Sequence, residues 1–126
     1  VLDARRRLHA ARHVDWPAKP QHEFIADTVW HEVAYGKNAI SQHGHHGNAI
    51  LSRHAIGHYT NHDISDHALE KRGMLHAVSH FNGRRGSVDI HLINTHFGLI
   101  KRSRVRQAEF LVDFVRSQVP PDAPLI

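Results

Sequence analysis

The amino-acid sequence predicts an α+β fold, in which a series of strands is followed by one helix that leads back to a strand. Two periodicities support this prediction. Apolar residues alternate with polar ones from Val88 to Thr95, which is the period of a half-buried strand. Apolar residues recur every three or four positions from Arg102 to Val119, which is the period of an amphipathic helix. Strands followed by a helix favour a sheet packed against a helical layer.

The composition is typical of a single globular domain. The chain has 126 residues, of which 40% are hydrophobic and 22% are charged, and this composition argues against global disorder. Lys and Arg outnumber Asp and Glu by 16 to 12, and the resulting formal charge of +4 favours phosphate-bearing partners. The absence of cysteine excludes disulfides, thiolate zinc sites and thiol catalysis. No apolar run is long enough to span a membrane. The cellular location stays open, with a preference for the cytoplasm.

The other elements follow from local patterns. We expect a basic helix over residues 3–13, a proline-rich loop over 16–20 and a helical turn over 21–27. Strands are predicted over residues 28–35, 48–52, 57–64, 74–81 and 88–95. Polar loops are expected over 36–47 and 65–71, and a hairpin turn over 82–86. Ser103 is the expected N-cap of the helix, Pro120-Pro121 ends it, and Pro124-Leu125-Ile126 predicts the start of a buried strand.

His96 is the strongest candidate for a functional residue, because it lies where the best strand meets a loop. A neutral imidazole in a cleft accepts a proton, and an imidazolium holds a phosphoryl oxygen. The alternative is a structural histidine with no chemical role.

Four short motifs surround this histidine in the chain. They are Gly47-Asn48-Ala49-Ile50-Leu51-Ser52-Arg53, Lys71-Arg72-Gly73 with Leu75, Asn94-Thr95-His96, and the pair Arg104 and Gln107 at the start of the helix. Their order and spacing resemble the central part of the endonuclease/exonuclease/phosphatase superfamily, which is the deoxyribonuclease I-like superfamily. The resemblance covers residues 36–126.

The resemblance implies a four-layer αββα sandwich and a hydrolase that cleaves phosphomonoesters or phosphodiesters by metal-assisted attack of water. The expected cofactor is a divalent cation, usually magnesium, held by carboxylates. His96 is the implied catalytic residue at the scissile phosphate. Asn48 and Asn94 are the implied substrate-binding residues, and Arg72 is expected to be structural. The substrate stays open between nucleic acid, phospholipid and inositol phosphate. The alternative is a non-catalytic basic module that binds nucleic acid or another polyanion.

The same resemblance predicts that residues 1–126 are one partial phosphoesterase domain, truncated at both ends. The family's metal-binding Glu would precede Val1, and its Gly-Asp-Phe-Asn turn would follow Ile126. We therefore expect the isolated chain to be inactive, and either to be marginally stable or to self-associate through an uncovered apolar sheet face. Ser65-Asp66-His67 spells a further signature of the family. Because it precedes Asn94-Thr95-His96, coincidence is the preferred interpretation, with a genuine Asp–His pair as the alternative.

Histidine-rich and basic segments give further candidates. His43-Gly44-His45-His46, together with His54, His58 and His62, suggests either a zinc or nickel site or a solvated loop, and the flanking glycines favour the loop. Arg5-Arg6-Arg7 with Arg12 and His13 suggests either contact with a nucleic-acid backbone or a solvated helix face. Lys101-Arg102 with Arg104 and Arg106 is the better candidate for steering phosphate.

Overall fold

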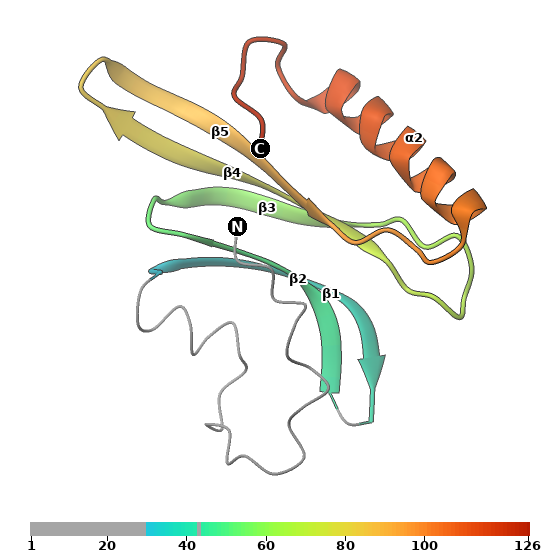
Figure 1. Ribbon diagram of the computed structural model, residues 1–126. Helices are drawn as coiled ribbons and strands as arrows, with labels where there is room; N and C mark the ends of the chain where they lie inside the picture. Colours follow the sequence, from blue (N-terminus) through green and yellow to red (C-terminus); the bar gives the residue numbers. More distant parts are fainter. Residues whose placement is uncertain (1–29, 43) are drawn as a thin grey trace.

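A computed structural model describes residues 30–42 and 44–126 of the chain (Figure 1). The helix, loop and turn expected before residue 30 lie outside these residues, as does His43. In the described part, the elements in chain order are β1 (Glu32–Ser41), β2 (Gly44–Ser52), β3 (Ile56–Asp63), β4 (Gly73–Gly83), β5 (Gly86–Thr95) and α2 (Lys101–Gln118).

The strands form two antiparallel sheets. β1 and β2 make a two-stranded hairpin, and β3, β4 and β5 make a three-stranded sheet in that order. The chain returns to the outer edge of β5 after α2, where Leu125 forms a parallel bridge with His91. The amide of Ile93 donates to the carbonyl of Ile126 at 2.8 Å. The strand expected from Pro124 is thus only an isolated bridge with backbone hydrogen bonds to β5, and Leu125 and Ile126 are exposed rather than buried.

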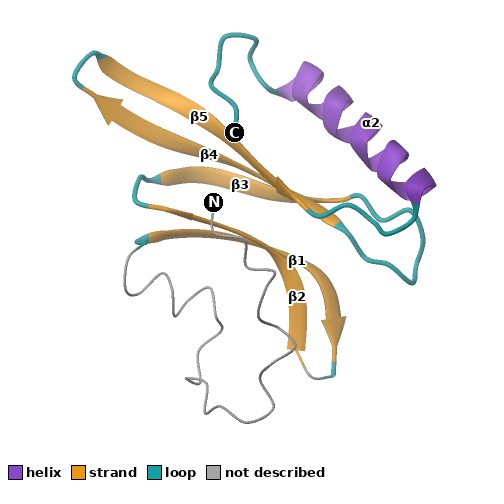
Figure 2. Cartoon of the chain, viewed as in Figure 1, coloured by secondary structure: helices purple, strands orange, loops and turns teal. Residues whose placement is uncertain are grey.

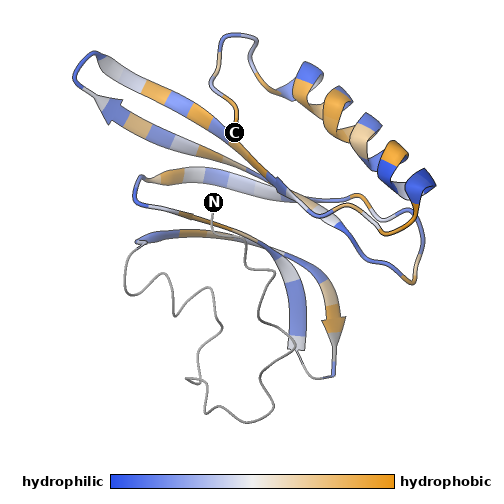
Figure 3. Ribbon diagram, in the orientation of Figure 1, coloured by the Kyte–Doolittle hydropathy of each residue, from blue (hydrophilic) through white to orange (hydrophobic). Residues whose placement is uncertain are grey.

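β4 is the central strand of the fold, because it is buried on both faces from Gly73 to Ser79. Leu75 and Ala77 point toward the β1–β2 hairpin and form the apolar core with Ala34 of β1. On the other face, the ring of His76 lies 5.1 Å from that of Phe114 in α2. Figure 3 shows the alternation of apolar and polar residues along the β4–β5 hairpin. β4 therefore carries one layer on each side, α2 on one and the β1–β2 hairpin on the other.

The expected four-layer αββα sandwich is wrong. Residues 30–42 and 44–126 form a small, mostly β fold of the α+β class, with one helix and sheets of two and three strands (Figure 2). A fourth layer requires a second amphipathic helix, and the described sequence has the helical period only in α2. No helix of the described part covers the outer face of the β1–β2 hairpin.

Two local predictions also need correction. The expected polar loop over residues 36–47 is instead the distal half of the β1–β2 hairpin, with a register shift between Lys37 and Ala39. Its backbone groups pair across the hairpin whatever the polarity of the side chains, so composition misled the prediction. Ser103 is not the N-cap, because α2 begins at Lys101 after Ile100. Ser103 is instead buried in the first turn and bonds to Asp66.

Among the described residues, no helix combines the length and the apolar character that crossing a membrane requires.

Candidate functional site

A cleft of about 560 Å³ opens where β5 ends, between the β1–β2 hairpin and two loops. The loops are residues 64–72, which precede β4, and residues 96–100, which precede α2. The cleft is lined by Asn38, Ala39, His46, Gly47, Asn48, His67, Leu69, Glu70, Lys71, Arg72, His96, Leu99 and Ile100. It therefore brings together residues of three of the four motifs found in the sequence.

Asn48 and His96 meet in this cleft although they come from different sheets. Asn48 lies in β2 and is buried. Its amide nitrogen donates to the carbonyl of Gly73 at 2.7 Å and to that of Asn94 at 3.2 Å. His96 follows the last residue of β5 and is exposed. The hydroxyl of the preceding Thr95 donates to the same Gly73 carbonyl at 3.1 Å, so a single carbonyl anchors both segments.

Asn94 joins the two sheets but does not line the cleft. Its amide nitrogen donates to the carbonyl of Ala49 at 2.8 Å, while its own carbonyl accepts from Asn48. The two asparagines thus exchange hydrogen bonds between β2 and β5. Their nitrogens are engaged in the fold, and contact of either residue with a substrate stays a prediction.

Gly73 is required by close packing between the sheets, a role that its motif did not reveal. A Cβ at this position would lie 1.9 Å from the side-chain oxygen of Asn38 and 2.8 Å from that of Asn61. Either contact is too short for real atoms, so a larger residue would have to displace the side chains of Asn38 and Asn61. The sequence signal for this requirement is the glycine at the start of a strand.

The charged lining of the cleft is basic. Lys71 is exposed, and Arg72 donates to Glu70 at 2.8 Å. Glu70 is the one carboxylate among the described lining residues, and it is already engaged. It also accepts from the amide of Leu99 at 3.1 Å, and its oxygen lies 3.7 Å from Nε2 of His67. Arg72 is structural, as expected, because its guanidinium ties it to Glu70.

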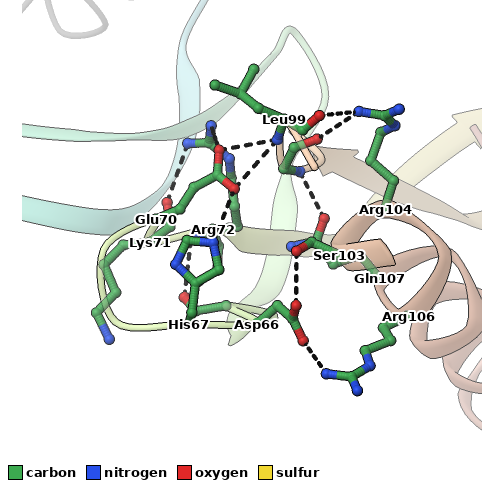
Figure 4. A network of polar contacts seen from close by, with 12 residues as sticks. Asp66, His67, Glu70, Lys71, Arg72, Leu99, Ser103, Arg104, Arg106 and Gln107 are labelled. Carbon is green, nitrogen blue, oxygen red and sulfur yellow. Dashed lines mark hydrogen bonds and ion pairs between the residues drawn. The ribbon is translucent and has the colours of Figure 1, made fainter. Parts of the chain in front are cut away.

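The Ser65-Asp66-His67 sequence has a structural role. Asp66 accepts from the hydroxyl of Ser103 at 2.8 Å and pairs with Arg106 (Figure 4). These hydrogen bonds, first that of Ser103 and then that of Arg106, lower the pKa of Asp66. His67 turns toward Glu70 instead. Asp66 and His67 thus have different partners, and the alternative of an Asp–His pair is not found.

The described histidines of the proposed zinc or nickel site, which exclude His43, are spread over the fold. His45 shares a 2.7 Å hydrogen bond with Tyr35, and burial raises the pKa of that tyrosine. His54 stacks edge-on against Phe81, while His62 packs 4.8 Å from Phe114 under α2. No group of three metal-binding side chains is found within residues 30–42 and 44–126.

The basic segment at the start of α2 divides into two parts. Arg104 donates to the carbonyls of Gly98 and Leu99, and Arg106 pairs with Asp66. Both are therefore committed to the fold. Lys101 and Arg102 are exposed beside the cleft loop and keep the predicted capacity to steer phosphate. Arg5-Arg6-Arg7, Arg12 and His13 lie outside the described residues.

Comparison with known proteins gives relatives but no activity. No family model and no solved structure matches the chain. The chain is 39% identical over 121 residues to the uncharacterized protein YbhP of Escherichia coli strain K12. It has the same identity to YbhP of Escherichia coli O6:H1 and to YbhP of Shigella flexneri. Each match covers 94% of this chain and 46% of the relative, so the chain spans about half the length of the curated relatives it matches.

Proposed function

We propose that this chain is part of a phosphate-ester hydrolase, as its resemblance to the endonuclease/exonuclease/phosphatase superfamily implies. The observation that supports the proposal best is the meeting of Asn48 and His96 in one cleft with Lys71 and Arg72. These residues belong to three separate motifs, and tertiary folding alone brings the three motifs together. A cleft with this lining attracts an anion, because its two cations outnumber the single carboxylate of Glu70.

Each group then has a simple task. Lys71 binds phosphoryl oxygens, while Arg72, which Glu70 holds in place, adds positive charge beside them. His96, exposed at the cleft wall, either accepts a proton from the attacking water or donates one to an oxygen of the ester. Asn48 supplies a polar wall fixed by its hydrogen bonds to the backbone. The chemistry suits phosphate esters of nucleic acid, phospholipid or inositol phosphate.

The proposed magnesium ion needs carboxylate ligands from residues that the structure does not describe. A magnesium ion takes carboxylate oxygens that are free to coordinate. In the cleft as described, Glu70 is the sole carboxylate, and Arg72 and the Leu99 amide occupy it. The described lining does not fit the ion by itself. We therefore assign no step to magnesium, and we expect residues 1–126 alone to be inactive.

A second candidate function is a non-catalytic module that binds polyanions. The engagement of Glu70 by Arg72 favours it, because the described cleft is then basic without any free carboxylate. Such a module needs neither a metal nor His96, which distinguishes it from a hydrolase.

The two functions are separated by assaying the full-length protein on bis-p-nitrophenyl phosphate and on p-nitrophenyl phosphate, with magnesium or with EDTA. Binding of a fluorescein-labelled oligonucleotide, and of vesicles containing phosphatidylinositol phosphate, is measured in parallel by anisotropy and by sedimentation. The hydrolase predicts turnover that EDTA abolishes and that residues 1–126 lack. Binding without turnover would establish the basic module instead, and the absence of both would reject both functions.

A further inference from the structure

The loop that follows His96 is held by side chains rather than by regular secondary structure. It links Thr95, the last residue of β5, to Lys101, the first of α2. The amide of Gly98 donates to the side chain of Gln107 at 2.7 Å. The amide of Leu99 donates to both carboxylate oxygens of Glu70, at 3.1 and 3.3 Å. The carbonyls of both residues accept from Arg104 (Figure 4).

Gln107 is the centre of this arrangement. Its side chain is buried, with 3% exposure. The carboxamide oxygen accepts from Gly98, and the nitrogen donates to the carbonyl of Ile64 at 3.0 Å. One side chain of α2 thus joins the loop after β5 to the loop before β4. Loss of this carboxamide would leave two buried backbone groups without partners.

Packing leaves the loop little room to move. A Cβ on Gly98 would lie 2.7 Å from a carboxylate oxygen of Glu70 and 3.3 Å from the Cβ of Ser103. The backbone of Gly98 is therefore seated directly against loop 64–72 and α2. His96 is two residues away from Gly98 along the chain, so a shift of Gly98 is expected to displace the backbone that carries the imidazole.

We infer that Gln107, Glu70 and Arg104 are positioning residues for His96. They touch neither substrate nor reacting atoms in this role; they fix the backbone that carries the imidazole. The inference rests on the proposed function, since positioning affects a rate only if His96 acts on a bound phosphate. A catalytic group displaced by about 1 Å can lose about a hundredfold in rate.

The test uses the full-length protein with Gln107→Met, which keeps the length of the side chain but removes its hydrogen bonds. Gln118→Met is the matched control, because Gln118 is an exposed glutamine at the end of the same helix. We expect Gln107→Met to lower kcat by about tenfold to a hundredfold while KM changes by less than about threefold. Gln118→Met should leave both constants unchanged.

A second readout does not depend on activity. Amide exchange at Gly98 and the pH titration of the His96 ring signals are followed by NMR in the same proteins. Gln107→Met should speed exchange at Gly98 and shift the His96 signals. Unchanged exchange and unchanged His96 signals would overturn the inference, as would faster exchange with normal kcat. If the wild-type protein shows no turnover, the proposed function fails, and the NMR result alone decides whether Gln107 positions His96.

Arg104→Met keeps the inference testable if Gln107→Met does not fold. Arg104 is exposed, so its loss should spare the core while releasing the carbonyls of Gly98 and Leu99. Its control is Arg116→Met, an exposed arginine in the last turn of α2. The same changes in kcat and in the His96 signals are expected for Arg104→Met only. Identical behaviour of the two variants would contradict the inference.

Discussion

The imidazole rings of His76 and His91 are stacked beneath α2, with 5.2 Å between their centroids. Nε2 of His76 lies 3.0 Å from Nδ1 of His91, and both side chains are buried. One of these nitrogens must donate a proton and the other must accept it. The contact is therefore lost if both rings are protonated, because two N–H groups would then face each other.

This stacked pair predicts that acid destabilises the fold. The pKa of His76 is lowered to about 4, first by burial and then by repulsion from His91, His58 and His62. Its contribution to stability is complete above the unfolded pKa, near 6.5, and is lost progressively as the pH falls toward 4. The free energy of unfolding should decrease in this window by at most about 1.4 kcal/mol per pH unit from His76. Urea unfolding at a series of pH values measures the slope.

A variant isolates this contribution from that of the other histidines. His76→Gln should flatten the dependence of stability on pH between about 6.5 and 4. His46→Gln, which removes an exposed histidine, should leave it unchanged. If the free energy of unfolding depends on pH equally in wild type and in His76→Gln, protonation of His76 is not linked to unfolding.

For the proposed reaction, His96→Ala in the full-length protein should lower kcat by about a hundredfold or more, the range for loss of a general acid or base. The melting temperature should change little, because His96 is exposed at the cleft and contributes little packing. His91→Ala provides the contrast. His91 is buried, and it lies on the face of β5 opposite to that of Leu92 and Asn94. Its loss should therefore reduce stability, while the folded fraction keeps its kcat. Near-normal turnover by His96→Ala would return His96 to a structural role.

The exchange of hydrogen bonds between Asn48 and Asn94 predicts a coupled loss of stability. Asn48→Ala should cost about 1–3 kcal/mol, because the buried carbonyl of Gly73 and that of Asn94 lose a donor. Asn94→Ala should cost a similar amount through Ala49. Since each residue bonds to the strand of the other, the double variant should lose less than the sum of the two. Strict additivity in urea unfolding would mean that the asparagines act independently.

The isolated chain should self-associate through an apolar groove of about 450 Å³ beside the end of β5. The groove is lined by Ile93, Thr95, Leu111, Val112, Val115, Arg116, Leu125 and Ile126. Val112 is 45% exposed there, and a charge at this position should oppose burial of the groove. Sedimentation equilibrium of residues 1–126 should show concentration-dependent association that Val112→Lys reduces. Val105→Lys alters a similarly exposed valine of α2 outside the groove and should have no such effect. A strict monomer in wild type would contradict the prediction.

The periodicity of apolar residues predicted most of the strands and the helix correctly, because secondary structure depends mainly on residues that are close together in the chain. The helix expected over residues 102–119 is found at Lys101–Gln118, and the strand expected over 88–95 at Gly86–Thr95. The alternation of apolar and polar residues also predicted each end of β4 to within two residues. The exceptions are the distal half of the β1–β2 hairpin, the buried strand expected from Pro124 and the N-cap role of Ser103. In the first and the last, the backbone or the hydroxyl has a partner across the fold that local composition does not reveal.

The residues and their spacing were enough to predict the order of strands and helix, the basic character of the chain and the motifs that contain Asn48 and His96. The folded structure was needed to reveal that these residues share a cleft, that Glu70 is engaged by Arg72, and that Gln107 holds Gly98. It also decided that the second sheet has two strands and that the described chain has no fourth layer. The physical reason is that strand and helix formation follow from local geometry, whereas these contacts join residues far apart in the chain, whose hydrogen bonds exist only once the sheets have packed.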